Sequence, residues 1–318
     1  MKDPQRIQVL RLGSRASPLA RAQSGLLARA LERAHPALRV EPVEIATQGD
    51  RDRRSALHSF GGAGVFVKAL EVALQAGRID AAVHSLKDLP TRLPKGLILG
   101  AVGPREDVRD VLVTRRKSLS AGAVLGSGSP RRRGQMLRKR PGLRFEEIRG
   151  NVESRLRQVA QGRYDGTILA RAGLRRLRIP QAGSRLARLA FRTLPLSTLL
   201  PAPGQGALAV ECRAADGRTR RLLRAIHDPR VAVCVNAERA LLAALGGGCH
   251  LPLGACARVS KGRLELTTVL VAPDGSSEVR ARATGPAGAP EALGRRVAQT
   301  IRLRAGTFPA LRRLLKGK

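Results

Sequence analysis

Strand-like and helix-like segments alternate from the beginning of this chain, and the alternation restricts the fold more than any other feature of the sequence. Apolar runs at residues 7–12 and 40–46 flank residues 18–34, in which Leu26 and Ala30 belong to one helical stripe. A strand that is followed by a helix and then by another strand is typical of a mostly parallel sheet covered by helices. We therefore predict an α/β fold for the first part of the chain.

The same alternation recurs after Gly103, and the pattern changes again near the end. Residues 195–206 are rich in Pro and Gly and lead into an apolar run at 207–211, which could return to the first sheet and form a hinge beside a cleft. From about residue 225 the pattern is a helix, a glycine-rich loop, and strands joined by the hairpin signal Asp274-Gly275. We predict two similar α/β domains around a cleft and a smaller C-terminal α+β domain. The predicted bounds are residues 1–103 with 204–224, residues 104–203, and residues 225–318.

Neither a membrane span nor a disulfide framework is expected. Uncharged stretches at 193–210 and 240–257 approach the length of a span, but Pro and Gly residues interrupt both. The residues before the first apolar run lack the apolar centre of a secretory signal, so a cytoplasmic location is expected. The four cysteines form no C-x-x-C pair, and a chain of 318 residues can fold without disulfides. Free thiols and no metal site are therefore expected.

The chain is strongly basic, because 59 Lys and Arg residues against 24 Asp and Glu residues give a net charge of +35. Such a surplus suits a nucleic-acid ligand, since binding releases counterions from the phosphates. However, aromatic residues make up only 2% of the chain, Trp is missing, and no zinc-finger or RNA-binding motif is present. A specific nucleic-acid partner is not expected, and a solvated basic surface accounts for the charge equally well.

The segment Ser85-Leu86-Lys87-Asp88 follows an apolar strand and precedes a Pro turn. This places its side chains at the carboxyl edge of a parallel sheet, where binding clefts form. A carboxylate there can transfer protons or stabilise a cation. The alternative is that Asp88 is a helix cap or an ordinary surface residue.

Two basic clusters, residues 129–133 and residues 149–155, lie where a strand passes into a helix. The free N–H groups and the dipole of a helix N-terminus favour anions, and Arg binds carboxylate or phosphate in a bidentate manner. Together the clusters indicate a polyanionic ligand. Either cluster alone is explained as well by a solvated helix face.

Cys249 is the one cysteine on a glycine-flanked loop, whereas the others lie in apolar, strand-like or helical segments. A loop thiol can be reached by an electrophile. The adjacent His250 does not make a catalytic dyad, because neighbouring loop residues seldom point the same way. The alternative is an inert thiol.

Taken in order, these segments resemble the porphobilinogen deaminase family over nearly the whole chain. Ten runs carry the resemblance: GSRASPLA (13–20), TQGD (47–50), FVKALE (66–71), HSLKDLP (84–90), RED with RD (105–110), Ser129 with Arg131 and Arg132, IRGNV with Arg155 (148–155), LARAGL (169–174), PGQGA (203–207) and GGC (247–249). Each run is weak alone, but ten in the same order are specific. Two positions depart from the pattern: Ala63 stands where members often have Lys, and Pro130 replaces an aliphatic residue.

The resemblance implies a transferase. Two domains like those of periplasmic binding proteins would face each other across the active-site cleft, and a third domain would hold a dipyrromethane cofactor by a thioether bond to Cys249. Four molecules of porphobilinogen would be condensed onto this primer with loss of ammonia, and hydrolysis would release hydroxymethylbilane for haem and other tetrapyrrole biosynthesis. Porphobilinogen is then the expected partner of a monomeric enzyme, and no metal is implied.

The resemblance also assigns roles to single residues. Asp88 matches the catalytic carboxylate, which would exchange protons and hold the cationic azafulvene that forms when ammonia leaves. The matching cofactor-binding positions are Cys249, Lys87, Ser129, Arg131 and Arg132, and the matching substrate-binding positions are Arg15, Ser17, Ser85, Arg149, Arg155, Arg176 and Gln205. Most of them suit the acetate and propionate groups that every pyrrole ring carries.

Two rival interpretations remain open at the level of the residues. A non-enzymatic protein that binds a small anion between two domains would have no use for Asp88 together with Cys249. A nucleic-acid-binding protein would bind DNA or RNA with a steep dependence on salt. Only the deaminase should weigh more than its sequence by two linked pyrrole units.

Overall fold

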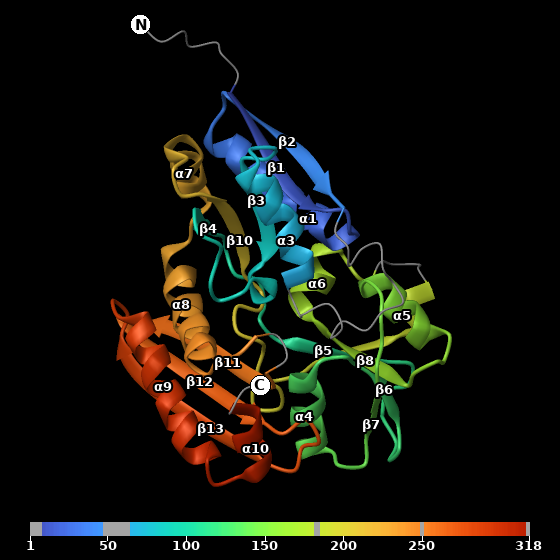
Figure 1. The fold of residues 1–318 in the computed structure, drawn as a ribbon. Coiled ribbons are helices and arrows are strands. Elements are labelled where there is room, and N and C mark those ends of the chain that lie inside the picture. The colour runs from blue at the N-terminus through green and yellow to red at the C-terminus, as the bar shows by residue number, and fades with distance from the viewer. Residues whose placement is uncertain (1–7, 47–63, 181–184, 249–250, 316–318) are drawn as a thin grey trace, which may run out of the picture. The chain divides into compact units, whose positions relative to one another are not determined.

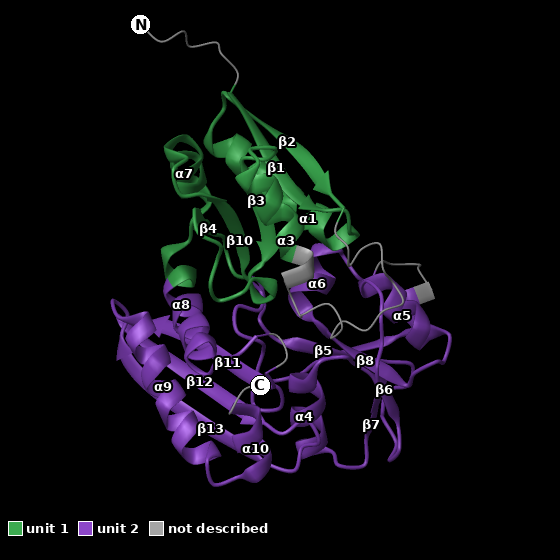
Figure 2. Ribbon diagram, in the orientation of Figure 1, with its two compact units in different colours: residues 1–105, 207–232 green, residues 106–206, 233–318 purple. Residues whose placement is uncertain are grey.

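The structure is a computed structural model that describes residues 8–46, 64–180, 185–248 and 251–315. The chain forms two compact units (Figure 2), Met1–Arg105 with Ala207–Ala232 and Glu106–Gly206 with Val233–Lys318. Each unit is described by itself below. Among the described residues, no helix is both long and apolar enough to cross a membrane.

The first unit is built on a five-stranded sheet with the order β2-β1-β3-β10-β4 (Figure 1). The strands are β1 (Gln8–Arg15), β2 (Leu38–Ile45), β3 (Ala81–Ser85), β4 (Leu97–Val102) and β10 (Leu208–Arg213), and the helices are α1 (Pro18–Ala34), α3 (Gly64–Gln75), α7 (Gly217–Leu223) and the short 3-10 helices η2 (Leu86–Asp88) and η4 (Arg224–Ile226). Strand β1 is parallel to β2 and β3, whereas β10 is antiparallel to β3 and β4. The predicted return of the apolar run at 207–211 to the first sheet is therefore confirmed.

Helix α1 begins at Pro18, because the Ser17 side chain accepts a hydrogen bond from the Ala20 N–H and Pro at the first helical position has no N–H to satisfy. The helix lies where the sequence predicts it, but the predicted buried stripe is wrong by one residue. Leu26 is 42% exposed, and Leu27 instead packs on the sheet.

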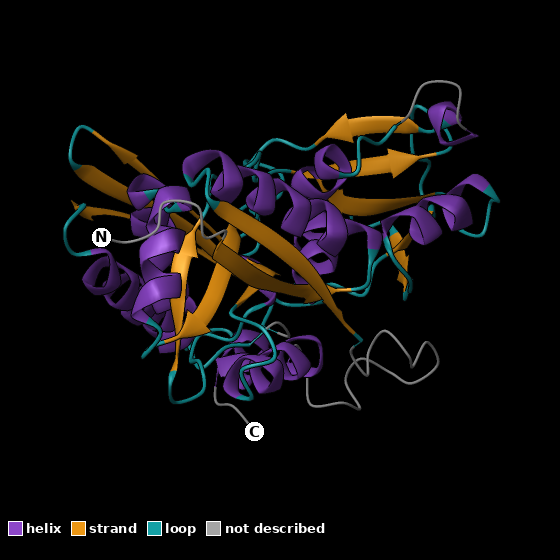
Figure 3. Ribbon diagram, turned by 90° about the horizontal axis from the view of Figure 1, so that it is seen from above, coloured by secondary structure: helices purple, strands orange, loops and turns teal. Residues whose placement is uncertain are grey.

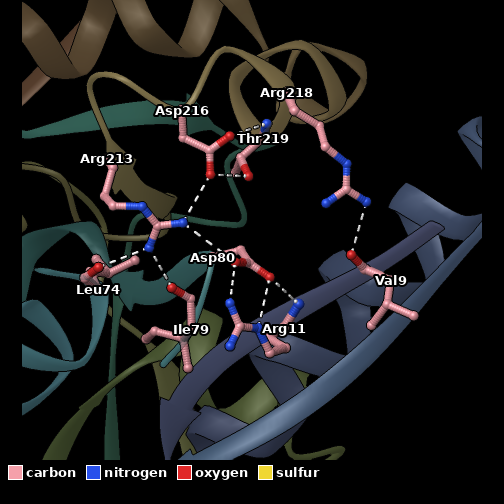
Figure 4. A network of polar contacts seen from close by, with 9 residues as sticks. All are labelled: Val9, Arg11, Leu74, Ile79, Asp80, Arg213, Asp216, Arg218 and Thr219. Atoms are coloured by element: carbon pink, nitrogen blue, oxygen red, sulfur yellow. Dashed lines mark hydrogen bonds and ion pairs between the residues drawn. The ribbon is translucent and has the colours of Figure 1, made fainter. Parts of the chain in front are cut away.

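A polar network holds the first unit together at the end of the sheet where β1 begins (Figure 4). Asp80, before β3, accepts hydrogen bonds from Arg11 at 2.7 and 3.1 Å, and Arg213 Nη2 lies 3.4 Å from Asp80 and 2.9 Å from Asp216. Burial alone would raise the pKa of Asp80, but the hydrogen bonds from Arg11 and then Arg213 outweigh it, so that pKa is lowered. The network links β1, β3, β10 and α7.

The second unit contains another five-stranded sheet, with the order β7-β6-β8-β5-β9. Its elements are β5 (Asp110–Thr114), β6 (Val124–Gly126), α4 (Pro130–Lys139), β7 (Arg144–Glu146), α5 (Val152–Ala160), β8 (Gly166–Ala170), α6 (Arg171–Arg176), the 3-10 helix η3 (Arg185–Arg188) and β9 (Ala190–Thr193). Strands β6, β7 and β8 are parallel, and β5 is antiparallel to both β8 and β9. The ends of the parallel strands and the start of β5 therefore meet at one edge.

The C-terminal part of this unit is an antiparallel sheet in the order β11-β12-β13, with helices packed on it. Its elements are α8 (Pro229–Ala244), of which residues 229–232 still belong to the first unit, β11 (Leu253–Ser260), β12 (Arg263–Val271), β13 (Glu278–Pro286), α9 (Pro290–Ala305) and α10 (Pro309–Leu315). Gly275 takes a positive φ of 75° in the predicted turn between β12 and β13, a conformation that favours glycine. Buried Leu200, Cys256 and Val271 join this sheet to the preceding residues of the unit.

The predicted fold class is confirmed. Along the chain, strands and helices alternate through both five-stranded sheets, and the C-terminal part is α+β. Figure 3 distinguishes the helices from the strands of this mixed fold. The bounds of the three predicted domains, residues 1–103 with 204–224, 104–203 and 225–318, stay a prediction.

Candidate functional site

In the first unit, the predicted residues gather at the carboxyl ends of β1 and β3. Arg15 is the last residue of β1, and Ser17 caps the helix that follows. Ser85 is the last residue of β3, and its hydroxyl accepts a hydrogen bond of 2.9 Å from Gln23 of α1. Because β1 and β3 are parallel neighbours, these three residues share one edge of the sheet.

Lys87 and Asp88 lie on the single turn of 3-10 helix that follows β3. Two buried leucines, Leu86 at 1% and Leu89 at 3% exposure, anchor this turn, and the Leu86 N–H donates to the Ala207 carbonyl at 3.1 Å. The Asp88 side chain is exposed and forms no hydrogen bond or ion pair with the described residues. The fold thus presents a carboxylate to solvent on a firmly anchored turn.

In the second unit, two helices begin at the corresponding edge of the sheet. Ser129 caps α4 by accepting from the Arg132 N–H at 3.4 Å, and Asn151 caps α5 by accepting from the Ser154 N–H at 2.8 Å. Gly150, before the second cap, has a φ of +99°, and a Cβ there would lie 2.6 Å from the Ser154 hydroxyl. Only glycine fits this connection well, and both helices direct free N–H groups toward the edge.

Three of the predicted binding residues converge on Asp110, which is fully buried at the start of β5. The Asp110 carboxylate accepts hydrogen bonds from Arg131 Nη2 at 2.9 Å, from Arg132 Nη2 at 2.8 Å and from Gln205 Nε2 at 3.1 Å. Burial lowers the pKa of Arg131, and the Asp110 charge opposes that effect. Sequence reasoning assigned no role to Asp110, although an acidic residue that opens an apolar strand near an Arg pair is a signal for such a contact.

The positive charge at this edge exceeds the negative charge of Asp110. Arg155 is partly buried on α5, and its Nε donates to the Gly150 carbonyl at 2.8 Å. Burial and then the nearby Arg132 lower the pKa of Arg155 to about 10, so the group stays protonated at neutral pH. Within the described residues Arg155 has no carboxylate partner, so it can bind an added anion.

The remaining predicted residues of this unit have other contacts. Arg149 lies 2.9 Å from the Glu147 carboxylate, and both side chains are partly exposed. Arg176 donates to the Gly206 carbonyl at 2.6 Å, beside the buried Gln205. Burial lowers the pKa of Arg176, and the negative charge of Glu106 opposes this effect in part.

Cys249 lies outside the described residues, as does Ala63. The other three cysteines are buried. Burial, followed by the charge of Asp216, raises the pKa of the Cys212 thiol to about 11, which makes that thiol a poor nucleophile. In the described part of the chain, no group of three or more His, Cys, Asp or Glu side chains could hold a metal ion.

The predicted residues therefore fall into two parts with different chemistry, one in each unit. The first unit offers an exposed carboxylate beside a lysine, and the second offers helix N-termini and arginines with excess positive charge. Proton transfer suits the first part, and recognition of carboxylates or phosphates suits the second.

Comparison with known proteins gives matches to family models, to curated relatives and to solved structures. The family model "Porphobilinogen deaminase, dipyromethane cofactor binding domain" matches residues 10–221, and "Porphobilinogen deaminase, C-terminal domain" matches residues 232–302. Porphobilinogen deaminases of Syntrophotalea carbinolica and Gloeobacter violaceus are 44% and 46% identical, over 92% of this chain and 92% and 89% of theirs. A probable amino-acid ABC transporter extracellular-binding protein of Bacillus subtilis is a structural neighbour, with a TM-score of 0.41, 11% identity, and coverage of 69% of this chain and 90% of that chain.

Proposed function

The chain belongs to the porphobilinogen deaminase family, and we propose that the two groups of residues described above carry out that family's reaction. The activity is that of a transferase, hydroxymethylbilane synthase, which condenses four porphobilinogen molecules with loss of ammonia in tetrapyrrole biosynthesis. The predicted enzyme class is thus confirmed, and neither rival interpretation accounts for the family match.

One observation carries the assignment of residues: where two helices begin, the positive charge of the arginines exceeds the negative charge of the buried Asp110. Arg132 and Arg155 supply this charge, Asp110 neutralises only part of it, and Ser129 belongs to the same edge. Porphobilinogen and each added pyrrole ring carry carboxylates, which guanidinium groups bind with two parallel hydrogen bonds. We assign these residues, with Arg131, Arg149, Arg176 and Gln205, to the binding of cofactor and substrate.

The residues present also fit the dipyrromethane cofactor of this family. Its ring carboxylates match the arginine-rich edge of the second unit, and Ser129 and Lys87 can donate to them. When bound, the cofactor supplies the pyrrole carbon to which the first substrate ring is joined. We propose Cys249 as its attachment point, since the other three thiols are buried.

Asp88 is the residue to which we assign proton transfer. Its exposed carboxylate is not engaged by the described residues, and the buried Leu86 and Leu89 fix the turn that carries it. As a carboxylic acid, Asp88 can donate its proton to the leaving amine, and the carboxylate that results stabilises the positive charge that develops on the substrate as ammonia leaves. Arg15, Ser17 and Ser85, at the same sheet edge, would orient substrate beside it.

We further propose that the enzyme is a monomer, that it acts in the cytoplasm, and that it has no specific nucleic-acid partner. Cys212, Cys234 and Cys256 form no disulfide with the described residues, which supports a reducing compartment. The family's small-molecule substrate and the scarcity of aromatic side chains that could stack on bases support the lack of a nucleic-acid partner.

The experiment that tests the function compares Asp88→Asn with wild type. The change keeps the size of the side chain but removes its charge, so the rate of porphobilinogen consumption should fall by about 10²–10⁴-fold. The matched control is Asp274→Asn in the β12–β13 turn, which should keep the wild-type rate. A fall of less than about tenfold for Asp88→Asn would move the catalytic role to another residue.

Intact mass measures the state of each preparation in the same experiment. Wild type and Asp88→Asn should both exceed the mass of the sequence by two linked pyrrole units, whereas Cys249→Ser should not, because a serine hydroxyl is a far weaker nucleophile than a thiolate. A normal mass gain in Cys249→Ser would place the attachment elsewhere.

A further inference from the structure

Three buried titratable side chains lie together in the first unit, and the mechanism above uses none of them. His84 on β3 is 6% exposed, Glu211 on β10 is 0% exposed, and Glu71 on α3 is 9% exposed. In the antiparallel pairing of β3 and β10, Ala209 lies opposite His84 and Ala82 lies opposite Glu211, so His84 and Glu211 project from the same face of the sheet. His84 Nε2 is 3.2 Å from Glu211 Oε2.

These side chains lack hydrogen bonds that buried polar groups normally make. His84 Nε2, both carboxylate oxygens of Glu211 and Oε1 of Glu71 have no hydrogen-bond partner among the described residues. The contact between His84 and Glu211 thus lacks hydrogen-bond geometry. Because a buried charge without compensation is costly, the charges of the cluster must balance one another.

Charge balance within these three side chains requires two protons. Two ionised carboxylates beside a neutral imidazole would leave two negative charges against the apolar core on this side of the sheet, which includes Leu70, Leu74 and Ala82. A proton on His84 removes one unit of negative charge, and a proton on Glu71 or Glu211 removes the other. Glu211 is the carboxylate in contact with His84, so it is the one that gains most from staying ionised.

The surroundings of Glu71 favour its neutral form. Burial, and then the charge of Glu211, raise the pKa of Glu71, whereas His84 and Lys68 act in the opposite direction with less effect. Lys68 is exposed, so water screens its charge. Arg15 of β1 projects from this face too, since a Cβ on Gly13, two residues earlier, would meet Leu70 of α3. Strand β4 contributes no charged residue.

We propose that Glu71, His84 and Glu211 form a neutral buried cluster, with His84 as the cation, Glu211 as the anion and Glu71 as a carboxylic acid, and that the pair of His84 and Glu211 positions the segment bearing Asp88. His84 directly precedes Ser85, after which the chain leaves the sheet. Leu86 N–H donates to the carbonyl of Ala207, one residue before β10 begins. The ion contact therefore fixes β3 against β10 directly below the turn that carries Asp88.

This inference rests on the proposed role of Asp88 in one respect only, the predicted effect of the cluster on catalytic activity. Glu211 is a positioning residue, because it acts on Asp88 through His84 and the end of β3. The cluster itself can be observed without any reaction.

The test compares two identical substitutions within the cluster, Glu71→Gln and Glu211→Gln, in the full-length, cofactor-loaded enzyme. Glu71→Gln exchanges a neutral acid for a neutral amide, so its Tm and kcat should remain close to wild type. Glu211→Gln leaves the imidazolium without its anion, so its Tm should fall by about 5–10 °C. Its kcat should fall by about tenfold or more because Asp88 is displaced, while KM changes little because the arginines are untouched.

A spectrum of ¹⁵N-labelled histidine at neutral pH gives the second measurement, with His84 assigned by its loss in His84→Gln. Wild type and Glu71→Gln should show both His84 ring nitrogens protonated, and Glu211→Gln should show a neutral ring. A neutral His84 in wild type, or equal effects of the two glutamine variants on Tm, would overturn the charge assignment. A wild-type kcat in Glu211→Gln would overturn the positioning role. An active Asp88→Asn would instead refute the catalytic assignment, and the spectra and Tm values would still test the cluster independently.

Discussion

Replacement of Asp110 by Asn should be among the most destabilising single changes of comparable size in the second unit. The carboxylate is fully buried and accepts hydrogen bonds from Arg132 Nε and Nη2, from Arg131 and from Gln205. Asparagine has one acceptor oxygen, and its NH₂ group would face guanidinium N–H groups. Since loss of one partner of a buried ion pair costs about 3–5 kcal/mol, and this carboxylate balances two cations, we expect a loss of at least about 3 kcal/mol in the free energy of unfolding.

Urea denaturation followed by far-UV circular dichroism measures this loss, provided that the m value stays constant. The matched control is Glu147→Gln, because Glu147 also forms an ion pair with an arginine, Arg149, but the two side chains are 49% and 31% exposed. An exposed pair is worth about 0–1 kcal/mol, so the control should change little. A loss below about 1 kcal/mol for Asp110→Asn would show that Asp110 is not the counter-charge of the arginine pair.

Two further predictions concern binding and pH. Arg155→Lys keeps the charge but loses the bidentate fork, so the KM for porphobilinogen should rise about tenfold in steady-state kinetics. The control is Arg157→Lys on the exposed face of the same helix, which should leave KM unchanged. An unchanged KM in Arg155→Lys would exclude a contact between Arg155 and substrate. Asp80 has a lowered pKa, so its contribution to stability is present above the unfolded pKa of about 3.9 and is lost as pH falls through the lower folded value. The difference in unfolding free energy between wild type and Asp80→Asn should therefore be large at neutral pH and shrink below about pH 4, and a difference that is constant with pH would contradict this.

The sequence predicts the elements of the fold well, because their signals are local. The strand ending at Ser85, the helix after Pro130 and the turn at Asp274-Gly275 all lie where apolar runs, Pro and Gly place them. The apolar periodicity does not predict the buried face of α1, because that face includes Gln23 and Ser24, which hydropathy assigns to solvent. Gln23 is buried because it donates a hydrogen bond to Ser85, which lies 62 residues later in the sequence. The periodicity of apolar residues within one helix does not reveal such a distant partner.

In the candidate site, too, the sequence predicts the positions that depend on local signals but not the contacts between distant residues. Local patterns place Asp88 after a strand and Arg155 in the first turn of a helix, and the structure agrees. The partners of Arg132 depend on tertiary packing, because Arg132 lies on α4 and Asp110 reaches it from strand β5, 22 residues earlier in the chain. The sequence alone therefore cannot distinguish an arginine that is neutralised inside the fold from one that is left for a ligand.

The contacts around Asp110 indicate different roles for the neighbouring residues Arg131 and Arg132. Arg131 is 5% exposed and is engaged by Asp110 through Nη2 and by the Leu200 carbonyl through Nη1, so its charge supports the fold. Arg132 directs Nε and Nη2 to Asp110, whereas its Nη1 has no hydrogen bond to a described residue. A site that binds carboxylates has to hold positive charge before the ligand arrives. The single negative charge of Asp110 stabilises two buried arginines at once, and the pair therefore keeps a net positive charge for a ligand. Arg132 is therefore the member of the pair that we expect to contact a ligand carboxylate directly, and we expect Arg131 to contribute to binding by holding Asp110 and Arg132 in place.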